Sequence, residues 1–175
     1  SVRQFGAEWG AWWRSQSGDK VGQEPWNASN RLTWKPIPSL TYWDTWGPEW
    51  KAWIGAIWAR EQVTLTPAEA AQPATLLLSA VDDMDQTFVN GVSVGGKNDP
   101  SNPRSYPVPR SVLKAGANEI LVYARNLWGQ GGFKGPDDQL ALTFADGHSK
   151  PLTSGWQYSK IADSVGQPPT APWEG

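Results

Sequence analysis

The sequence predicts an all-β protein, an antiparallel jelly-roll β-sandwich with a short N-terminal helix. From about residue 53, short segments rich in β-branched and aromatic residues alternate with clusters of Gly, Pro, Asn and Asp. The pair Asn90-Gly91 separates two such segments, and it tolerates the positive φ angles of a two-residue hairpin turn. No internal repeat divides this region, so the strands are expected to form one sandwich.

A helix is predicted over residues 2–16, because its apolar residues recur at intervals of three and four. They are Val2, Phe5, Trp9, Trp12 and Trp13. Gly18 is expected to end this helix. Residues 17–50 have no clear period and predict a long irregular loop, with one short strand near residues 32–34. Exposure of an apolar helix face to water is unfavourable, so the helix and the loop are expected to pack on the sandwich.

The strand region is expected to begin near residue 54. Strands are predicted at residues 54–66, 74–81, 106–108, 118–125, 140–144 and 156–161, and a hairpin of two short strands at residues 86–94. The continuous apolar run in 74–81 indicates a central strand covered on both faces. Prolines in and beside 106–108 indicate an edge strand, and residues 110–115 are expected to form one helical turn. Along 118–125, alternate residues are expected to face opposite sides of the sheet.

The predicted domain organisation has three parts. Residues 1–30 form the helix and a Trp-rich lead-in, residues 31–162 the sandwich, and residues 163–175 a Pro-rich exit linker. The chain begins at Ser1 rather than with an initiator Met, so we expect a processed chain or a piece of a longer protein.

Composition excludes several classes of function. The 15 Lys and Arg against 17 Asp and Glu give a net charge of −2 with no basic stripe, which argues against nucleic-acid partners. No apolar run approaches the roughly 18 residues of a membrane span, so no membrane partner is expected. The absence of cysteine and the single histidine disfavour transition-metal sites, and no cofactor is expected.

Tryptophan is unusually frequent: there are 13, and ten lie between Trp9 and Trp58. A flat indole can stack on the C–H face of a pyranose ring, so this richness favours carbohydrate as a partner. Core packing is the alternative for each indole, and about two-thirds of them are expected in the core.

Two further segments carry chemistry-bearing residues. Asp82, Asp83 and Asp85 are interpreted as a structural turn whose carboxylates accept backbone N–H groups and hold the hairpin at Asn90-Gly91. Calcium ligation, direct ligand contact and a glycosidase acid–base pair remain alternatives for these carboxylates.

The loop 128–135 is rich in glycine, which lets backbone approach another surface closely. Trp128 and Phe133 offer aromatic planes, and Arg104 and Lys134 offer donors. This loop is expected either to dock on a neighbouring domain or to contact sugar.

Seven motifs along the chain, taken together, resemble those of a known family of domains. In order, they are Trp34-Lys35-x-Ile37-Pro38, Ile57-Trp58-Ala59-Arg60, Leu78-Ser79-Ala80-Val81-Asp82-Asp83-Met84-Asp85, Val89-Asn90-Gly91-x-x-x-Gly95, Arg104-x-Tyr106-x-Val108-Pro109, Leu113-Lys114-Ala115-Gly116-x-Asn118 and Gly129-x-Gly131-Gly132-Phe133-x-Gly135. From about Trp34 to Tyr158 the chain resembles the inserted β-domain of sialate O-acetylesterase-like carbohydrate esterases. More distantly, it is similar to the galactose-binding-like domain of glycoside hydrolases such as β-galactosidases. Residues 121–125 and the additional Trp43 and Trp46 depart from the family pattern, which leaves substrate preference open.

The resemblance implies a non-catalytic accessory domain inserted in a carbohydrate O-acetylesterase. Its implied partners are an SGNH-type esterase domain of the same polypeptide and an acetylated plant or bacterial glycan, in a secreted or periplasmic bacterial protein. The Pro-rich segment 168–174 fits a return into that esterase domain. An autonomous carbohydrate-binding module and a purely structural insert are the alternatives.

No catalytic residue is expected in this chain itself. Gly18-Asp19 is followed by Lys20 rather than by the serine of a Gly-Asp-Ser nucleophile, and Ala145 stands three residues before His148, where an Asp-x-x-His pair needs aspartate. The residues expected to contact glycan or a neighbouring domain are Trp43, Trp46, Arg104, Trp128 and Phe133.

Overall fold

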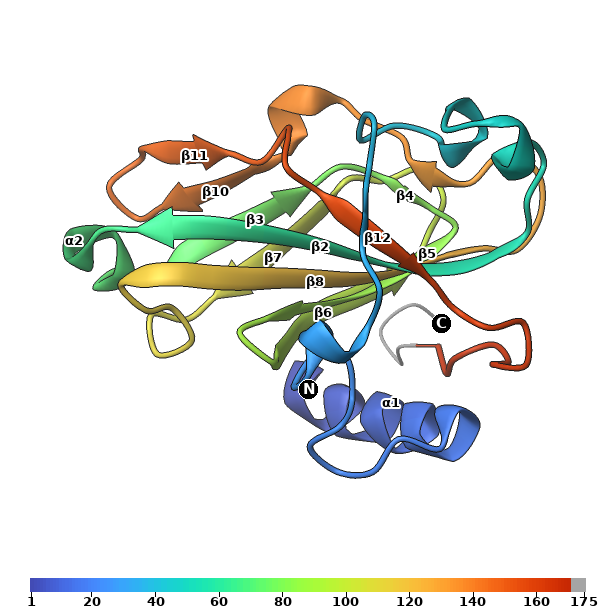
Figure 1. Cartoon of the computed structure of the whole chain (residues 1–175). Helices are drawn as coiled ribbons and strands as arrows, with labels where there is room; N and C mark the ends of the chain where they lie inside the picture. The colour runs from blue at the N-terminus through green and yellow to red at the C-terminus, as the bar shows by residue number, and fades with distance from the viewer. Residues whose placement is uncertain (171–175) are drawn as a thin grey trace.

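The computed structural model describes residues 1–170 as two antiparallel sheets packed face to face (Figure 1). The six-stranded sheet has the order β1 (Lys35–Pro36), β12 (Gln157–Lys160), β2 (Gly55–Leu65), β8 (Gly116–Asn126), β5 (Met84–Val89), β6 (Val92–Asn98). The four-stranded sheet has the order β11 (Ser149–Pro151), β10 (Ala141–Phe144), β3 (Ala74–Leu78), β7 (Arg104–Val108). The predicted all-β antiparallel sandwich with a short N-terminal helix is confirmed.

Smaller elements complete the fold. A separate two-stranded ribbon pairs β4 (Val81–Asp82) with β9 (Gly132–Phe133). The α-helices are α1 (Val2–Ser17) and the short α2 (Pro67–Ala70), and 3₁₀ turns lie at Ser29–Arg31, Trp43–Thr45, Pro48–Trp50 and Asp137–Gln139. Within residues 1–170, no helix is long and apolar enough to cross a membrane.

The main core lies between the two sheets, and the alternation of strand β8 shows how it forms. Ile120, Val122 and Ala124 face the core together with Ile57 and Ala59 of the paired strand β2. The four-stranded sheet contributes residues such as Leu76, Leu78, Leu142 and Phe144. These side chains are at most 3% exposed. The predicted two-face alternation of 118–125 is confirmed.

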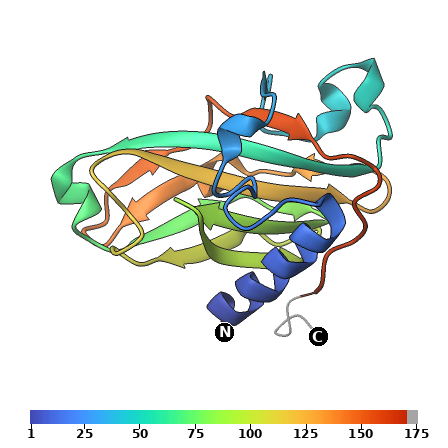
Figure 2. The same ribbon diagram turned by 60° about the horizontal axis from the view of Figure 1, so that its bottom comes forward.

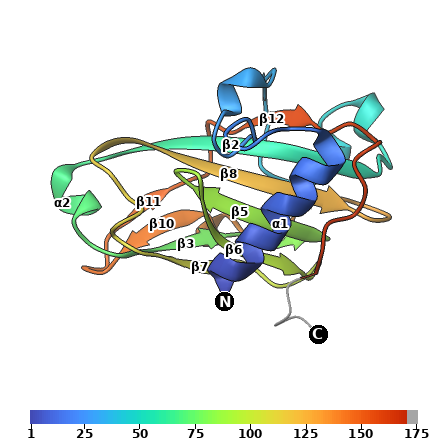
Figure 3. The same ribbon diagram turned by 90° about the horizontal axis from the view of Figure 1, so that it is seen from below.

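A second core lies on the outer face of the six-stranded sheet. Helix α1 crosses this face obliquely and lies in front of β5, β6 and β8 in the turned views (Figures 2 and 3). Phe5, Trp9 and Trp13 from the helix pack with the outward side chains of the sheet, which are Ala56, Trp58, Phe88, Leu121 and Tyr123. The predicted apolar stripe of the helix therefore does pack on the sandwich.

Local signals define both ends of α1. Ser1 and Gln4 form a capping box, in which the Ser1 hydroxyl accepts from the Gln4 backbone N–H at 3.2 Å. At the other end, Gly18 has φ of 80° and its N–H donates to the Arg14 carbonyl. Glycine adopts this left-handed conformation readily, so the predicted helix end is confirmed.

The turn between β5 and β6 has the predicted Asn90-Gly91 conformation, with φ of 48° and 82°. The Asn90 side chain also ties this turn to the neighbouring one. Its Nδ2 donates to the Val112 carbonyl and to Asn118 Oδ1, and its Oδ1 accepts from the Glu119 N–H, all within 2.9 Å. Both predicted turn residues thus have a structural role.

Three predicted elements differ from the structure. The short strand is at 35–36 rather than 32–34, because Trp34 turns its Nε1 to the Ser29 carbonyl and stacks on Arg60. Residues 110–112 form a hydrogen-bonded turn and not a helical turn. The run 74–81 divides into β3 and β4. Only one face of β3 is fully buried, since Thr75 and Leu77 on the other face are half-buried, so the predicted burial of both faces is wrong.

Truncation of Trp9 tests how strongly the helix depends on the outer-face core. Trp9 is 1% exposed and its ring lies within 6.2 Å of six other aromatic rings. We expect Trp9→Ala to lower the free energy of unfolding by about 3–5 kcal/mol, measured by urea denaturation. Val21→Ala, at a side chain that is 82% exposed, should change it by less than about 0.5 kcal/mol. Equal effects of the two substitutions would refute the second core.

Candidate functional site

Four of the five predicted contact residues are enclosed by their own chain. Trp43, Trp46 and Phe133 belong to the core between the sheets, and Arg104 is 1% exposed. The prediction that these four contact glycan or a neighbouring domain is therefore wrong, because their side chains have almost no surface to offer. Trp128 is 78% exposed, and its role stays a prediction.

The glycine-rich loop makes a close approach, as predicted, but to another part of this chain. The Trp43 N–H donates to the Gly131 carbonyl at 3.0 Å, and the Phe133 N–H donates to the Thr41 carbonyl at 3.3 Å. A Cβ on Gly131 would lie 2.5 Å from the Asn126 side chain and 2.6 Å from the Trp43 ring. Glycine therefore serves here to join the Trp-rich loop to the sandwich.

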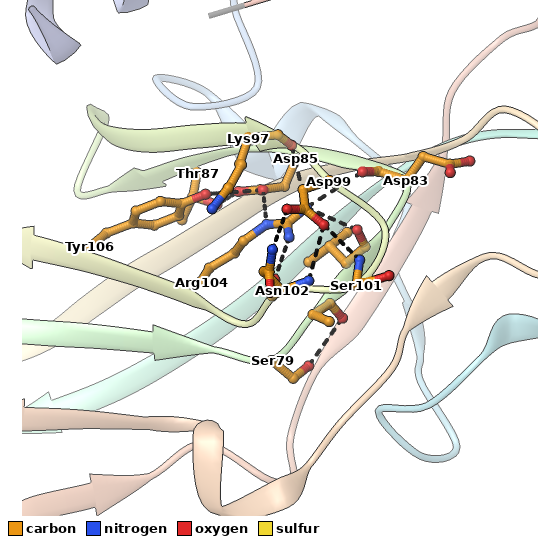
Figure 4. A network of polar contacts seen from close by, with 12 residues as sticks. Ser79, Asp83, Asp85, Thr87, Lys97, Asp99, Ser101, Asn102, Arg104 and Tyr106 are labelled. Atoms are coloured by element: carbon orange, nitrogen blue, oxygen red, sulfur yellow. Dashed lines mark hydrogen bonds and ion pairs between the residues drawn. The ribbon is translucent and has the colours of Figure 1, made fainter. Parts of the chain in front are cut away.

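Arg104 instead forms the centre of a buried polar network (Figure 4). Its Nε donates to Asp85 Oδ1 at 2.7 Å, and its Nη2 donates to the Val81 carbonyl at 2.9 Å. The Tyr106 and Thr87 hydroxyls donate to the same Asp85 carboxylate within 3.0 Å. Burial alone would lower the pKa of Arg104, but the adjacent Asp85 carboxylate raises it above its ordinary value.

The acidic segment divides between two structural roles. Asp83 Oδ2 accepts the Leu127 N–H at 2.7 Å, so the predicted capping of a backbone N–H is confirmed for this residue. Asp85 lies within β5 and bonds to side chains, and Asp82 lies in β4, so the prediction of one continuous turn is wrong. Burial and the hydrogen-bonded neighbour Asp83 raise the pKa of Asp82 to about 6. Residues 1–170 contain no group of three or more His, Cys, Asp or Glu side chains that could hold a metal ion.

His148 is held by carboxylates at the surface. Its Nε2 lies 3.0 Å from Glu69 Oε2, and its Nδ1 bonds to Asp146. These hydrogen bonds, the one to Glu69 first, raise the pKa of His148 above its ordinary value. Both ring nitrogens are thereby committed, and the pairing connects α2 to the turn after β10.

Sequence reasoning missed a groove of about 660 Å³ on the outer face of the six-stranded sheet. One wall is the segment Trp26–Arg31, and the opposite wall is formed by the turns at Asn90–Gly91 and Lys114–Ala117. Gln62 of β2 and Glu119 of β8 lie between these walls, directly opposite each other in the strand register. We refer to this feature as the outer groove.

Hydrogen bonds fix the walls of the outer groove. Ser29 Oγ donates to Glu119 Oε2 at 2.6 Å and accepts from Arg60 Nη1 at 3.2 Å, which holds the Trp26–Arg31 wall against the sheet. On the other side, the Asn118 side chain bonds to both backbone groups of Lys114. The groove is therefore formed in advance of any ligand.

An aromatic side chain completes one wall. Trp26 is half-buried, and its ring lies parallel to Phe88 with 4.7 Å between centroids. No local sequence signal marks the groove, because its residues come from four separate segments. The polar residues Arg60, Gln62 and Glu119, which lie on the same faces of their strands as apolar residues, were the one available hint.

Comparison with known proteins gives no family assignment. No protein-family model matches the chain, and no curated protein matches it. Among solved structures, a β-glucuronidase of Bifidobacterium dentium is 17% identical, with a TM-score of 0.44 over 49% of this chain and 14% of that one. A β-glucuronidase of an uncultured Clostridium sp. is 17% identical, with a TM-score of 0.45 over 72% of this chain and 23% of that one. A Ruminococcus gnavus β-glucuronidase is 14% identical, with a TM-score of 0.47 over 71% and 23%. This chain thus spans less than a quarter of each of these enzymes, and similarity at this level assigns it neither family nor activity.

Removal of the Arg104 guanidinium should strongly destabilise the fold. Arg104→Met leaves the Asp85 carboxylate buried without its cation, since both side chains are fully buried. We expect a loss of about 3–5 kcal/mol in the free energy of unfolding, measured by chemical denaturation. Lys134→Met, at an exposed position, is the control and should change it little. A loss below about 1 kcal/mol for Arg104→Met would contradict the structural role.

The His148 pairing predicts a pH dependence of stability. Because the folded pKa is raised, the contribution is fully present below the unfolded pKa of about 6.5 and is lost as pH rises through the folded value. The melting temperature should therefore fall between about pH 6 and pH 9, and His148→Gln should remove that part of the fall. Identical pH profiles for the two proteins would refute the pairing.

Proposed function

We propose that this chain is a non-catalytic β-sandwich module of a carbohydrate-active enzyme, and that it holds glycan in the outer groove for a neighbouring hydrolase domain. The groove is the observation that carries this proposal. It is open, rigidly built and lined by amides, charged groups and one indole, and such groups bind sugar hydroxyls and ring faces. Its volume falls within the range of about 300–1,000 Å³ that is usual for small-molecule sites.

Two side chains that could serve acid–base chemistry, Asp85 and His148, are committed to the fold, which supports a non-catalytic role. Asp85 is neutralised by Arg104 in the interior, and His148 is held between two carboxylates. A module of this kind would contribute to the reaction by positioning substrate, which accelerates a reaction without a reacting side chain.

The resemblance of the sequence motifs supports a more specific parent, a bacterial carbohydrate O-acetylesterase of the SGNH type that acts on acetylated glycan outside the cytoplasm. In that setting the module would lie beside the esterase active site. A purely structural insert is the second candidate, and the enclosure of Trp43, Phe133 and Arg104 favours it, since these residues stabilise the fold alone.

Titration with glycans tests the proposal. Isothermal titration of the chain with acetylated xylan, xyloglucan and sialyl-oligosaccharides should show saturable binding to at least one of them. Gln62→Ala should then weaken it about three- to ten-fold, because an exposed amide of the groove is lost. Trp128→Ala, at an exposed indole outside the groove lining, should leave binding unchanged.

Other outcomes decide among the alternatives. Loss of binding with Trp128→Ala but not with Gln62→Ala would move the site to the glycine-rich loop. No binding to any glycan, together with unchanged esterase kinetics when Gln62→Ala is placed in the parent enzyme, would favour the structural insert.

A further inference from the structure

The charges around the outer groove are balanced with one exception. Arg31 lines the groove, and its guanidinium forms an ion pair at 3.0 Å with Asp19, which does not line it. Glu119 accepts a hydrogen bond from Ser29, and the Arg60 guanidinium lies 3.2 Å from the same Ser29 hydroxyl. The Arg60 and Glu119 charges also attract each other, since Glu119 opposes the lowering of the Arg60 pKa by burial. These four groups contribute little net charge to the groove.

Lys114 is the exception. Its side chain is exposed and lines the groove, and its ammonium makes no hydrogen bond or ion pair with any residue in 1–170. Its backbone is nevertheless fixed, because the Lys114 N–H donates to Asn118 Oδ1 at 2.9 Å and the Asn118 Nδ2 donates to the Lys114 carbonyl at 2.7 Å. The groove therefore has one uncompensated charge, which is positive and attached to a rigid turn.

Two amide side chains that line the same groove also retain unused hydrogen-bonding capacity. The Gln62 side chain makes no hydrogen bond within the described part of the chain, and Asn30 uses only its Oδ1, which accepts from Arg60 at 3.0 Å. The Asn30 Nδ2 and the Gln62 amide are thus available to hydroxyl or carboxylate oxygens. A neutral sugar would satisfy the amides but would leave the ammonium without a partner.

We propose that the outer groove binds a glycan that carries a carboxylate, of the uronic-acid class. Lys114 pairs with the sugar carboxylate, and Asn30 and Gln62 bind neighbouring hydroxyl groups. This inference rests on the proposed function, in which the groove holds glycan, and it adds the chemical class of the ligand and the residue that selects it. Lysine recognises such a group as a point charge, so the selection is expected to weaken with salt.

A matched pair of ligands isolates the carboxylate. Oligogalacturonate and its fully methyl-esterified form share every hydroxyl and differ in the charged group. At low ionic strength we expect the acid form to bind about five-fold more tightly, which corresponds to about 1 kcal/mol for an exposed ion pair. Lys114→Gln should abolish this preference, and Lys114→Arg should retain it. Lys134→Gln, at an exposed lysine outside the groove lining, is the matched control and should not alter it.

The possible results separate the inference from the function on which it rests. Equal affinity for the two forms, with Gln62→Ala weakening both, would overturn the acidic-ligand inference and leave glycan binding in place. A preference for the acid form that survives Lys114→Gln would overturn the assignment of Lys114. Binding of neither oligosaccharide, nor of any glycan in the earlier panel, would overturn both proposals. Circular dichroism of each variant verifies that the fold is intact.

Discussion

The two-sided burial of the central strands β2 and β8 is the constraint on which the other features depend. Alternate residues of both strands face the core between the sheets, and the outward residues Trp58, Leu121 and Tyr123 are equally buried. A sheet that is apolar on both faces needs cover on both sides, because the exposed area would otherwise cost about 25 cal/mol per Å². The second sheet covers one face and α1 covers the other. The N-terminal helix is therefore a layer of the fold and not an appendage.

The outer groove follows from the point at which this two-sided character ends. Along β2 the outward residues change from Trp58 to Arg60 and Gln62, and along β8 from Leu121 to Glu119. Helix α1 covers the apolar part, and the polar part lies between the Trp26–Arg31 segment and two turns. The same sheet face thus supplies a hydrophobic base for the helix and a polar floor for the groove. Hydrogen bonds within the chain hold the groove walls in place.

Local patterns allowed much of the fold to be predicted, and the candidate site required information that local patterns lack. The helix, the Asn90-Gly91 turn and the two faces of β8 each depend on residues close in sequence, so the printed chain contains their signal. The exposure of Trp43 or Phe133 depends instead on which loop packs over it, and an indole in the core has the same sequence signature as one at a binding surface. Similarly, Ser29 meets Glu119 across 90 positions of sequence, and only the packing of the Trp26–Arg31 segment against β8 brings them together.

The brief strand β1 has a consequence for how this molecule behaves among its neighbours. It forms one edge of the six-stranded sheet, it pairs with β12 through only two residues, and one of these is Pro36, which lacks an N–H group. An edge strand that is so short and has so few backbone N–H donors offers few hydrogen bonds to a strand of another molecule. This edge of the sheet is thus protected against strand addition, and a longer, proline-free version of the segment would lose that protection.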